Sequence, residues 1–290
     1  MRHRLMLRLD SWEKRMQTIG IVYNPLSAAT AQAGAEIAAW LHDTGRTVWL
    51  GTSQTGRDQQ EEVAACEVLV ALGGDGTVLR AARLAIPHGI PILGVAMGHL
   101  SFMAEVTLAD LRSSLQVLMD GGGWYDERTL VQARVLRDGV EFMHDIALNE
   151  VLLTRSDLAR VVHVAVEIDG MPLTTYHADG VMVATATGST AYALAAGGPL
   201  LDPRSASLVL VTIAGHLTNI PALVLPPATV VTWKIQSRYP AALSIDGQSI
   251  HPLETTDQIE VSRSPLTCRF ARVHPRSHFY ETLTRRLRRE

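Results

Sequence analysis

Lysine, cysteine and long apolar runs are all scarce in this chain of 290 residues. Lys14 and Lys234 are its only lysines, and 26 basic residues stand against 29 acidic ones, so nothing in the charge predicts nucleic-acid binding. Cys66 and Cys268 form no CxxC or other metal-ligand spacing, which is typical of reduced thiols in a cytoplasmic protein. No stretch of about 18 apolar residues occurs, so we expect no membrane-spanning segment.

The first 17 residues are basic, but Arg8 and Asp10 interrupt their apolar stretch. That stretch is too short and too broken for the hydrophobic region of a signal peptide. We therefore interpret residues 1–17 as a surface extension of a cytoplasmic protein.

Strand-like and helix-like patterns alternate in the first half of the chain, which predicts parallel β-α units. Thr107 is the expected N-cap of the last helix, and Gly121 follows its end. The predicted strands lie in residues 18–25, 46–52, 66–72 and 89–97, and the predicted helices lie in residues 28–42, 77–85 and 107–122.

After Gly123 the pattern becomes mainly β, with turn dipeptides such as Asp138-Gly139 between apolar runs. A C-terminal helix, with Phe279, Leu283 and Leu287 as an apolar stripe, is expected to return to the first domain. We therefore predict an α/β domain with a parallel, Rossmann-like sheet over residues 18–124 plus about 275–290, and a β-rich domain over 125–274. The expected strands of the second half lie in residues 129–139, 143–155, 160–170, 180–186, 206–214, 229–237 and 258–263.

The most informative stretch is "LVALGGDGTVLRAAR", residues 69–83, where an apolar strand meets a glycine turn and then a helix. Such a turn is typical of phosphate binding, because backbone N–H groups and the helix dipole favour an anion there. Neither GxxxxGK[ST] nor GxGxxG fits, since Leu79 stands where the last glycine of the second motif is needed. Phosphate charge would be met by backbone N–H groups, by Arg80 or Arg83, or by a metal.

Asp75 is the one carboxylate in this turn. A carboxylate beside polyphosphate is repelled unless it holds a cation or takes a proton from the attacking hydroxyl. The alternative is an aspartate that only closes its own turn. The flanking glycines between strand and helix favour the functional interpretation.

Two features of the second half indicate a ligand site. Residues 177–203 are rich in glycine, serine and threonine, which suits a polar ligand or, alternatively, a crossover between strands. Ser189 lacks the GxSxG pattern of a serine hydrolase. Asn149 and Glu150 are adjacent polar residues in an apolar run, which indicates a bulge, a site or a plain edge strand.

Taken together, these stretches resemble the NAD kinases over about residues 18–287. GGDGT alone is shared with the related diacylglycerol kinases, sphingosine kinases and phosphofructokinases. TGSTAY followed by GGP is far more specific to NAD kinases. The resemblance implies a kinase that phosphorylates the adenosine-ribose 2′-hydroxyl of NAD with ATP or polyphosphate to give NADP. The matching motifs are, in chain order, GGDGT, LNEV, ADG, TGSTAY, GGP, IDGQ and HPRSHFYETLTRRL.

The resemblance also assigns roles to residues of this chain. It implies Asp75 as catalytic base, Asn149 and Glu150 as contacts of adenosine, and Asp179 as a substrate-facing acid. Mg²⁺ is expected to arrive with ATP, with no metal site assigned in the protein, and a homodimer or homotetramer is expected. The remaining residues implied to bind substrate are Gly74, Gly76, Thr77, Phe102, Arg160, His177, Thr187, Thr190, Ala191, Tyr192, Ala195 and Gln248.

The chain departs from the family pattern around the expected substrate pocket. Two rival functions therefore stay open: a lipid or sugar kinase of the same superfamily, and a non-catalytic dinucleotide sensor. The departures stand at Ala96, Ser101, His177, Ala186, Ala195 and Gly215-His216, where family members often have asparagine, glycine, arginine, proline, serine and a proline-histidine pair.

Overall fold

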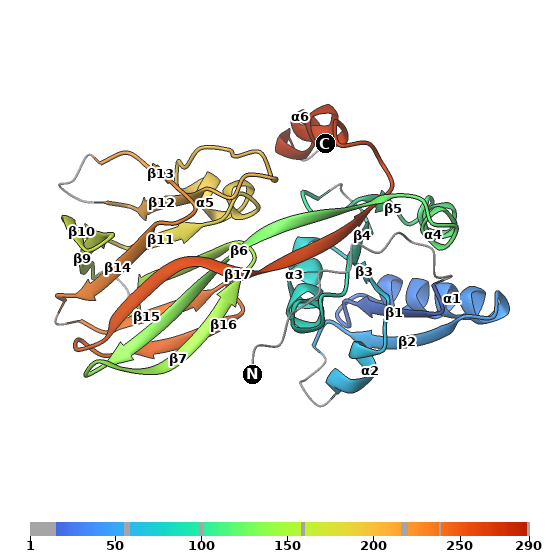
Figure 1. Cartoon of the computed structure of the whole chain (residues 1–290), viewed down its shortest axis with the longest axis horizontal. Coiled ribbons are helices and arrows are strands. Elements are labelled where there is room, and N and C mark those ends of the chain that lie inside the picture. Colours follow the sequence, from blue (N-terminus) through green and yellow to red (C-terminus); the bar gives the residue numbers. More distant parts are fainter. Residues whose placement is uncertain are drawn as a thin grey trace, which may run out of the picture. The chain divides into compact units, whose positions relative to one another are not determined.

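The computed structural model describes residues 16–54, 59–98, 101–157, 160–215, 220–237 and 239–288. The chain divides into two units, Met1–Asp126 with Arg269–Glu290, and Glu127–Cys268. Two long strands, β6 (Trp124–Arg137) and β17 (Gln258–Arg272), pair with each other and pass from one unit into the other (Figure 1). Among the described residues no helix is long and apolar enough to span a membrane.

The first unit contains a parallel sheet with the order β2-β1-β3-β4. Its strands are β1 (Thr18–Tyr23), β2 (Thr47–Thr52), β3 (Val68–Leu72) and β4 (Ile92–Ala96), with the short β5 (Val106–Thr107) beside β4. All residues of β3 and β4 are buried, as expected for parallel strands covered on both faces. The last part of β17 continues the sheet, since Phe270 pairs with Ile92.

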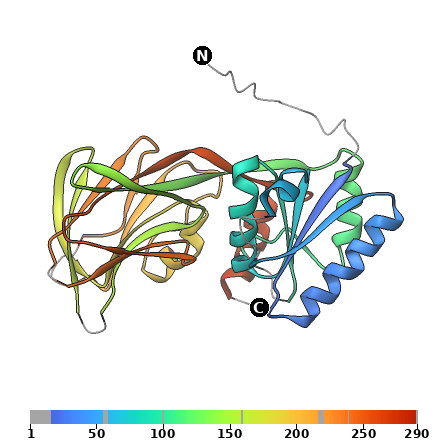
Figure 2. The same cartoon turned by 90° about the horizontal axis from the view of Figure 1, so that it is seen from below.

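Helices cover both faces of this sheet (Figure 2). Helix α1 (Ala28–Asp43) and helix α4 (Leu111–Met119) share one apolar cluster with the strands. Helix α3 (Asp75–Ala85) packs on β3 and β4, and continues into a short 3₁₀ turn, η2 (Ile86–His88). Helix α2 (Gln60–Ala64) precedes β3, and helix α6 (His278–Arg288) ends the described chain.

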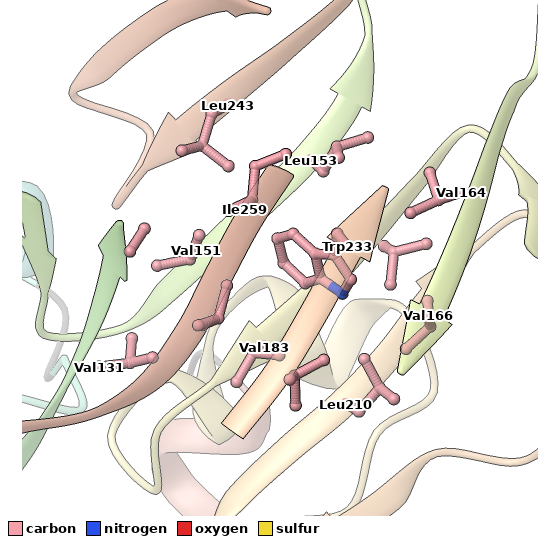
Figure 3. Close-up of a cluster of buried hydrophobic side chains, with 14 of the residues drawn as sticks. Val131, Val151, Leu153, Val164, Val166, Val183, Leu210, Trp233, Leu243 and Ile259 are labelled. Carbon is pink, nitrogen blue, oxygen red and sulfur yellow. The ribbon is translucent and has the colours of Figure 1, made fainter. Parts of the chain in front are cut away.

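The second unit is a sandwich of two sheets whose facing side chains form one core. One sheet has the order β13-β12-β11-β8-β15-β16, and the other contains β7, β9, β10, β14 and parts of β6 and β17. Trp233, fully buried, lies in this core with side chains from both sheets (Figure 3). The strands are β7 (Val140–Ala147), β8 (Glu150–Arg155), β9 (Val162–Ile168), β10 (Met171–Ala178), β11 (Gly180–Ala184), β12 (Leu208–Ile213), β13 (Leu223–Leu225), β14 (Val230–Ile235), β15 (Ala241–Ile245) and β16 (Ser249–Leu253).

A second, smaller apolar cluster lies on the other face of the β8 sheet. There Ala193 of helix α5 (Tyr192–Ala195) joins Leu152, Met182, Val209 and Val211. The 3₁₀ turn η3 (Gly188–Thr190) precedes α5 directly. The glycine-, serine- and threonine-rich segment therefore does more than cross between strands, because it covers the outer face of this sheet.

The structure confirms the predicted fold class and corrects three local expectations. The predicted strand 143–155 is two strands, β7 and β8, with a break at Leu148–Asn149, and β8 lies between β11 and β15 instead of at an edge. The N-cap of α4 is Asp110, while Thr107 ends β5 and donates its hydroxyl to Asp110.

The C-terminal helix α6 belongs to the first unit, as predicted. The face that it buries is not the expected apolar stripe. Leu287 of the expected apolar stripe is exposed, whereas Thr282 and Arg286 are buried. Polar contacts to the loop after β4 therefore help to dock this helix, a pattern that apolar periodicity does not detect.

Candidate active site

Asp75 is the first residue of helix α3, directly after the N-cap Gly74. Its Oδ1 accepts the N–H of Met103 at 2.9 Å, and its Oδ2 accepts the N–H of Phe102 at 3.2 Å. The carboxylate is thus held by the loop that follows β4, not by its own turn. This excludes the interpretation that Asp75 only closes the glycine turn.

The glycines around Asp75 serve two different needs. A Cβ on Gly73 would collide with the buried side chain of Thr77. The backbone at position 73 lies so close to Thr77 that it requires glycine. Gly74 and Gly76 are exposed, and apart from the adjoining backbone no heavy atom of the described residues lies within 4 Å of where their Cβ atoms would be. The backbone at the start of α3 is therefore open to an anion, which the helix dipole favours.

In the second unit, Asp246 organises the segment that contains the asparagine-acid pair. Asp246 and Gly247 adopt left-handed conformations, with φ of 53° and 65°, in the turn between β15 and β16. The buried Asp246 carboxylate accepts the N–H groups of Leu148 (2.9 Å), Asn149 (2.7 Å) and Glu150 (3.1 Å). Sequence reasoning selected Gln248 from this turn and missed Asp246.

The segment after β11 contacts Leu148 and Asn149 as well, through their carbonyl groups. Thr185 donates its hydroxyl to the Leu148 carbonyl at 2.5 Å and its N–H to the Asn149 carbonyl at 2.8 Å. A Cβ on Gly188 would collide with the Asn149 carbonyl and lie 2.6 Å from its carbon, so only glycine fits. Three separate motifs, LNEV, TGSTAY and IDGQ, are in this way joined around Asn149.

Asn149 and Glu150 are buried with spare polar atoms. Asn149 Oδ1 and Glu150 Oε2 have no hydrogen-bond partner among the described residues. Burial, and then the charge of Asp246, raises the pKa of Glu150 from 4.5 to about 8. Unpartnered buried polar atoms are costly in a native protein, which makes this pair a candidate for contact with a ligand.

Thr187, in the segment after β11, contacts a different residue. Its Oγ1 accepts Arg128 Nη1 at 3.2 Å, and both side chains are buried. Thr190 donates its hydroxyl to the Thr187 carbonyl at 2.9 Å, which closes η3. Tyr192 and Ala195, at the ends of α5, are exposed, and Ala191 links η3 to α5.

The sequence analysis did not select Arg128, because a single arginine within a strand pattern gives no local signal of a binding site.

The other expected binding residues make local contacts. Asp179 forms an ion pair with Arg155, with Nε to Oδ1 at 2.9 Å and Nη2 to Oδ2 at 3.3 Å. Arg160 lies 4.9 Å above the Tyr239 ring. The His177 ring lies 4.1 Å from that of His163 on the paired strand β9. In the described part of the chain these contacts do not include Asn149.

Two of the positions that depart from the family pattern are closely packed, and the other described ones are half-buried or exposed. Ala96 and Ala186 are buried, so each fits a closely packed position. Ser101 accepts the Ala104 N–H at 3.2 Å and thereby supports the loop that holds Asp75. Gly215 is exposed, and His216 lies outside the described residues.

No group of three histidine, cysteine, aspartate or glutamate side chains that could hold a metal ion is present in the described ranges. The donor set therefore does not fit a protein-built metal cage. Mg²⁺ usually binds through substrate phosphates with one or two carboxylates and does not require such a cage.

Comparisons with known proteins agree with this architecture. The model of the ATP-NAD kinase N-terminal domain matches residues 52–123, and that of the ATP-NAD kinase C-terminal domain matches residues 148–273. Among solved structures, yeast NADH kinase complexed with NADH superposes with a TM-score of 0.82 at 25% identity, covering 95% of this chain and 89% of that one. An Archaeoglobus fulgidus NAD kinase in complex with ATP has the same fold, with a TM-score of 0.76 at 22% identity, covering 94% and 100% of the two chains.

The fold and the two matched domains define the class as two-domain nucleotide-dependent kinases. An NAD kinase from Chloroflexus aurantiacus is 54% identical over 274 residues, which cover 94% of this chain and 99% of the relative. An NAD kinase from Dehalococcoides mccartyi is 37% identical over 93% of this chain and 95% of the relative. The chain belongs to the NAD kinase family.

Proposed function

We propose that the chain transfers a phosphoryl group from ATP to the 2′-hydroxyl of the adenosine ribose of NAD, giving NADP, with Asp75 as general base. The activity follows from family membership, which rests on both matched domains and on a relative of 54% identity. The comparisons favour neither a lipid or sugar kinase nor a non-catalytic sensor.

The observation that supports Asp75 as the base is how its carboxylate is held. Each oxygen accepts one backbone N–H, and an ionised carboxylate offers about four lone-pair sites in total. Free acceptor capacity therefore remains on a carboxylate whose orientation is fixed. A hydroxyl that donates to it can lose its proton as the oxygen attacks phosphorus, which is the positioning expected in phosphoryl transfer.

The phosphates of the donor would lie against the open backbone at Gly74 and Gly76. The sequence has no lysine between residues 15 and 233, so we expect N–H groups and the helix dipole to provide the stabilisation that a lysine of the phosphate loop supplies in other proteins. Mg²⁺ bound to the nucleotide supplies further charge neutralisation when present. Polyphosphate is a second candidate donor, because in this proposal the open turn binds phosphate groups and not the base of the nucleotide.

In the second unit, Asn149 and Glu150 would bind the adenosine part of NAD. Asn149 Oδ1 offers an acceptor, and Glu150, which is mainly protonated near neutral pH, offers a donor and an acceptor. Asp179, oriented by Arg155, and the segment from Thr187 to Ala195 are the further proposed contacts. A cytoplasmic homodimer or homotetramer is the proposed form of the enzyme.

A coupled assay for NADP formation tests this proposal, run with NAD and either ATP or polyphosphate. We expect NADP with ATP, and a loss of turnover of about 100-fold or more in Asp75→Asn, as for removal of a general base. Asp110→Asn, which changes an exposed aspartate at the start of α4, is the matched control and should keep wild-type turnover. Wild-type turnover in Asp75→Asn would remove Asp75 from this role.

A further inference from the structure

The loop after β4 connects Asp75 to a buried cation. Phe102 and Met103 present their N–H groups to the two oxygens of Asp75, at 3.2 Å and 2.9 Å. The carbonyl groups of this loop form a second set of contacts. Arg286 of helix α6 donates Nη1 to the Phe102 carbonyl at 2.9 Å and Nη2 to the Ala104 carbonyl at 3.3 Å.

One peptide unit therefore takes part in both contacts. The Phe102 carbonyl and the Met103 N–H belong to the same peptide group, with Arg286 on its oxygen and Asp75 on its hydrogen. A cation at the carbonyl polarises the peptide and strengthens its N–H as a donor. The guanidinium of Arg286 thus acts on the Asp75 carboxylate through one planar, rigid group.

A second arginine contacts the Met103 carbonyl of the same loop. Arg272 donates Nη1 to the Met103 carbonyl at 3.3 Å and to Glu105 Oε2 at 3.1 Å, and its Nε pairs with Asp126 at 3.2 Å. Arg272 has two carboxylate partners, which makes it part of an ion-pair network. Arg286 contacts the carbonyls on either side of Met103, and Arg272 contacts the Met103 carbonyl itself.

Burying an arginine is costly unless its hydrogen bonds compensate, and Arg286 is only 5% exposed. Bridging the Phe102 and Ala104 carbonyls with two guanidinium nitrogens needs the planar fork of arginine, which a lysine ammonium lacks. The neighbouring Arg285 is exposed on the same helix. The chain therefore buries one of two adjacent arginines, at the point where it supports the loop that holds Asp75.

We propose that Arg286 is a positioning residue for phosphoryl transfer, which fixes and orients the Asp75 carboxylate through the Phe102–Met103 peptide. This inference rests on the proposed role of Asp75. It assigns the C-terminal helix a part in the chemical step, although α6 contributes no group that touches the reacting atoms. A purely structural role, docking of α6, is the alternative that an experiment must separate.

The experiment measures kcat and both KM values for wild type, Arg286→Met, Arg286→Lys and the control Arg285→Met. Loss of the guanidinium releases the loop, and small displacements of a catalytic group lower the rate steeply. We expect kcat to fall about 10- to 100-fold in Arg286→Met, with KM for ATP and NAD within about 2-fold. The kcat of Arg286→Lys should lie between those of wild type and Arg286→Met, and the kcat of Arg285→Met should equal that of wild type.

The decisive comparison combines Arg286→Met with Asp75→Asn. If Arg286 acts through Asp75, then Arg286→Met changes the residual rate of Asp75→Asn by less than about 2-fold. An equal loss in both backgrounds, or a kcat in Arg286→Met equal to that of Arg285→Met, would overturn the proposal. If Arg286→Met does not fold, as judged by circular dichroism, the same comparisons are made with Arg286→Lys.

The two proposals fail in different ways. A wild-type enzyme that makes no NADP, or an Asp75→Asn variant with wild-type turnover, refutes the role of Asp75 and the dependent role of Arg286 together. An active wild type, a nearly inactive Asp75→Asn and an unaffected Arg286→Met refute only the role of Arg286.

Discussion

Glu150→Gln should change how the stability of the protein depends on pH. The side chain of Glu150 is buried beside Asp246, and its pKa is raised from 4.5 to about 8. Between these values the folded protein keeps a proton that the unfolded chain has lost. Because the unfolded state binds fewer protons there, this group makes the free energy of unfolding fall as pH rises from about 4.5 to about 8.

The size of the effect follows from the same shift. At 1.36 kcal/mol per pKa unit, the change from 4.5 to about 8 corresponds to at most about 5 kcal/mol. Local relaxation and water entry on ionisation reduce it, so we expect a few kcal/mol. Glutamine has the same shape and no charge, so the free energy of unfolding of Glu150→Gln should not fall in this way as pH rises. At alkaline pH, Glu150→Gln should therefore be more stable than wild type.

Urea unfolding of the ligand-free wild type and Glu150→Gln, at about pH 5 and about pH 8.5, measures the difference. Glu254→Gln, whose side chain is 64% exposed, is the matched control and should follow the wild type. The stability of Glu150→Gln relative to wild type should rise by at least about 1 kcal/mol between the two pH values. A difference that stays constant within about 0.5 kcal/mol would refute a buried, protonated Glu150.

Two further substitutions test how the segment around Asn149 is held. Asp246→Asn replaces one acceptor oxygen by an amide that faces a backbone N–H, so we expect a loss of about 1–3 kcal/mol in urea unfolding and a higher KM for NAD. Gly188→Ala places a methyl group against the Asn149 backbone, and we expect the free energy of unfolding to fall by about 1–3 kcal/mol. Gly98→Ala is the control, because the space at its Cβ is open, and it should leave the stability nearly unchanged. Unchanged stability and KM in Asp246→Asn, or equal effects of the two glycine substitutions, would contradict this arrangement.

The sequence predicted the elements whose signals are local. Buried runs such as Val68–Leu72 and the glycine turn before α3 give the parallel sheet and place Asp75 at a helix start. Asn149 and Glu150 were noticed because two adjacent polar residues break an apolar run. Their roles in binding stay predictions.

Residues that act through long-range contacts gave no comparable signal. Asp246 occurs in an Asp-Gly turn like those at Asp138 and Asp169, and only the fold brings its carboxylate to residues about 97 positions earlier in the chain. Arg286 is one of several arginines in a polar helix, and its burial depends on a loop 184 residues away. Local patterns cannot identify such partners, because their meaning is created by tertiary contacts.

The rate of a single turnover, with enzyme in excess over NAD and saturating ATP, tests the central claim most directly because binding and product release do not limit it. A general base at Asp75 predicts that this rate falls about 100-fold or more in Asp75→Asn, while Asp110→Asn keeps the wild-type rate. An equal rate in wild type and Asp75→Asn would contradict the account.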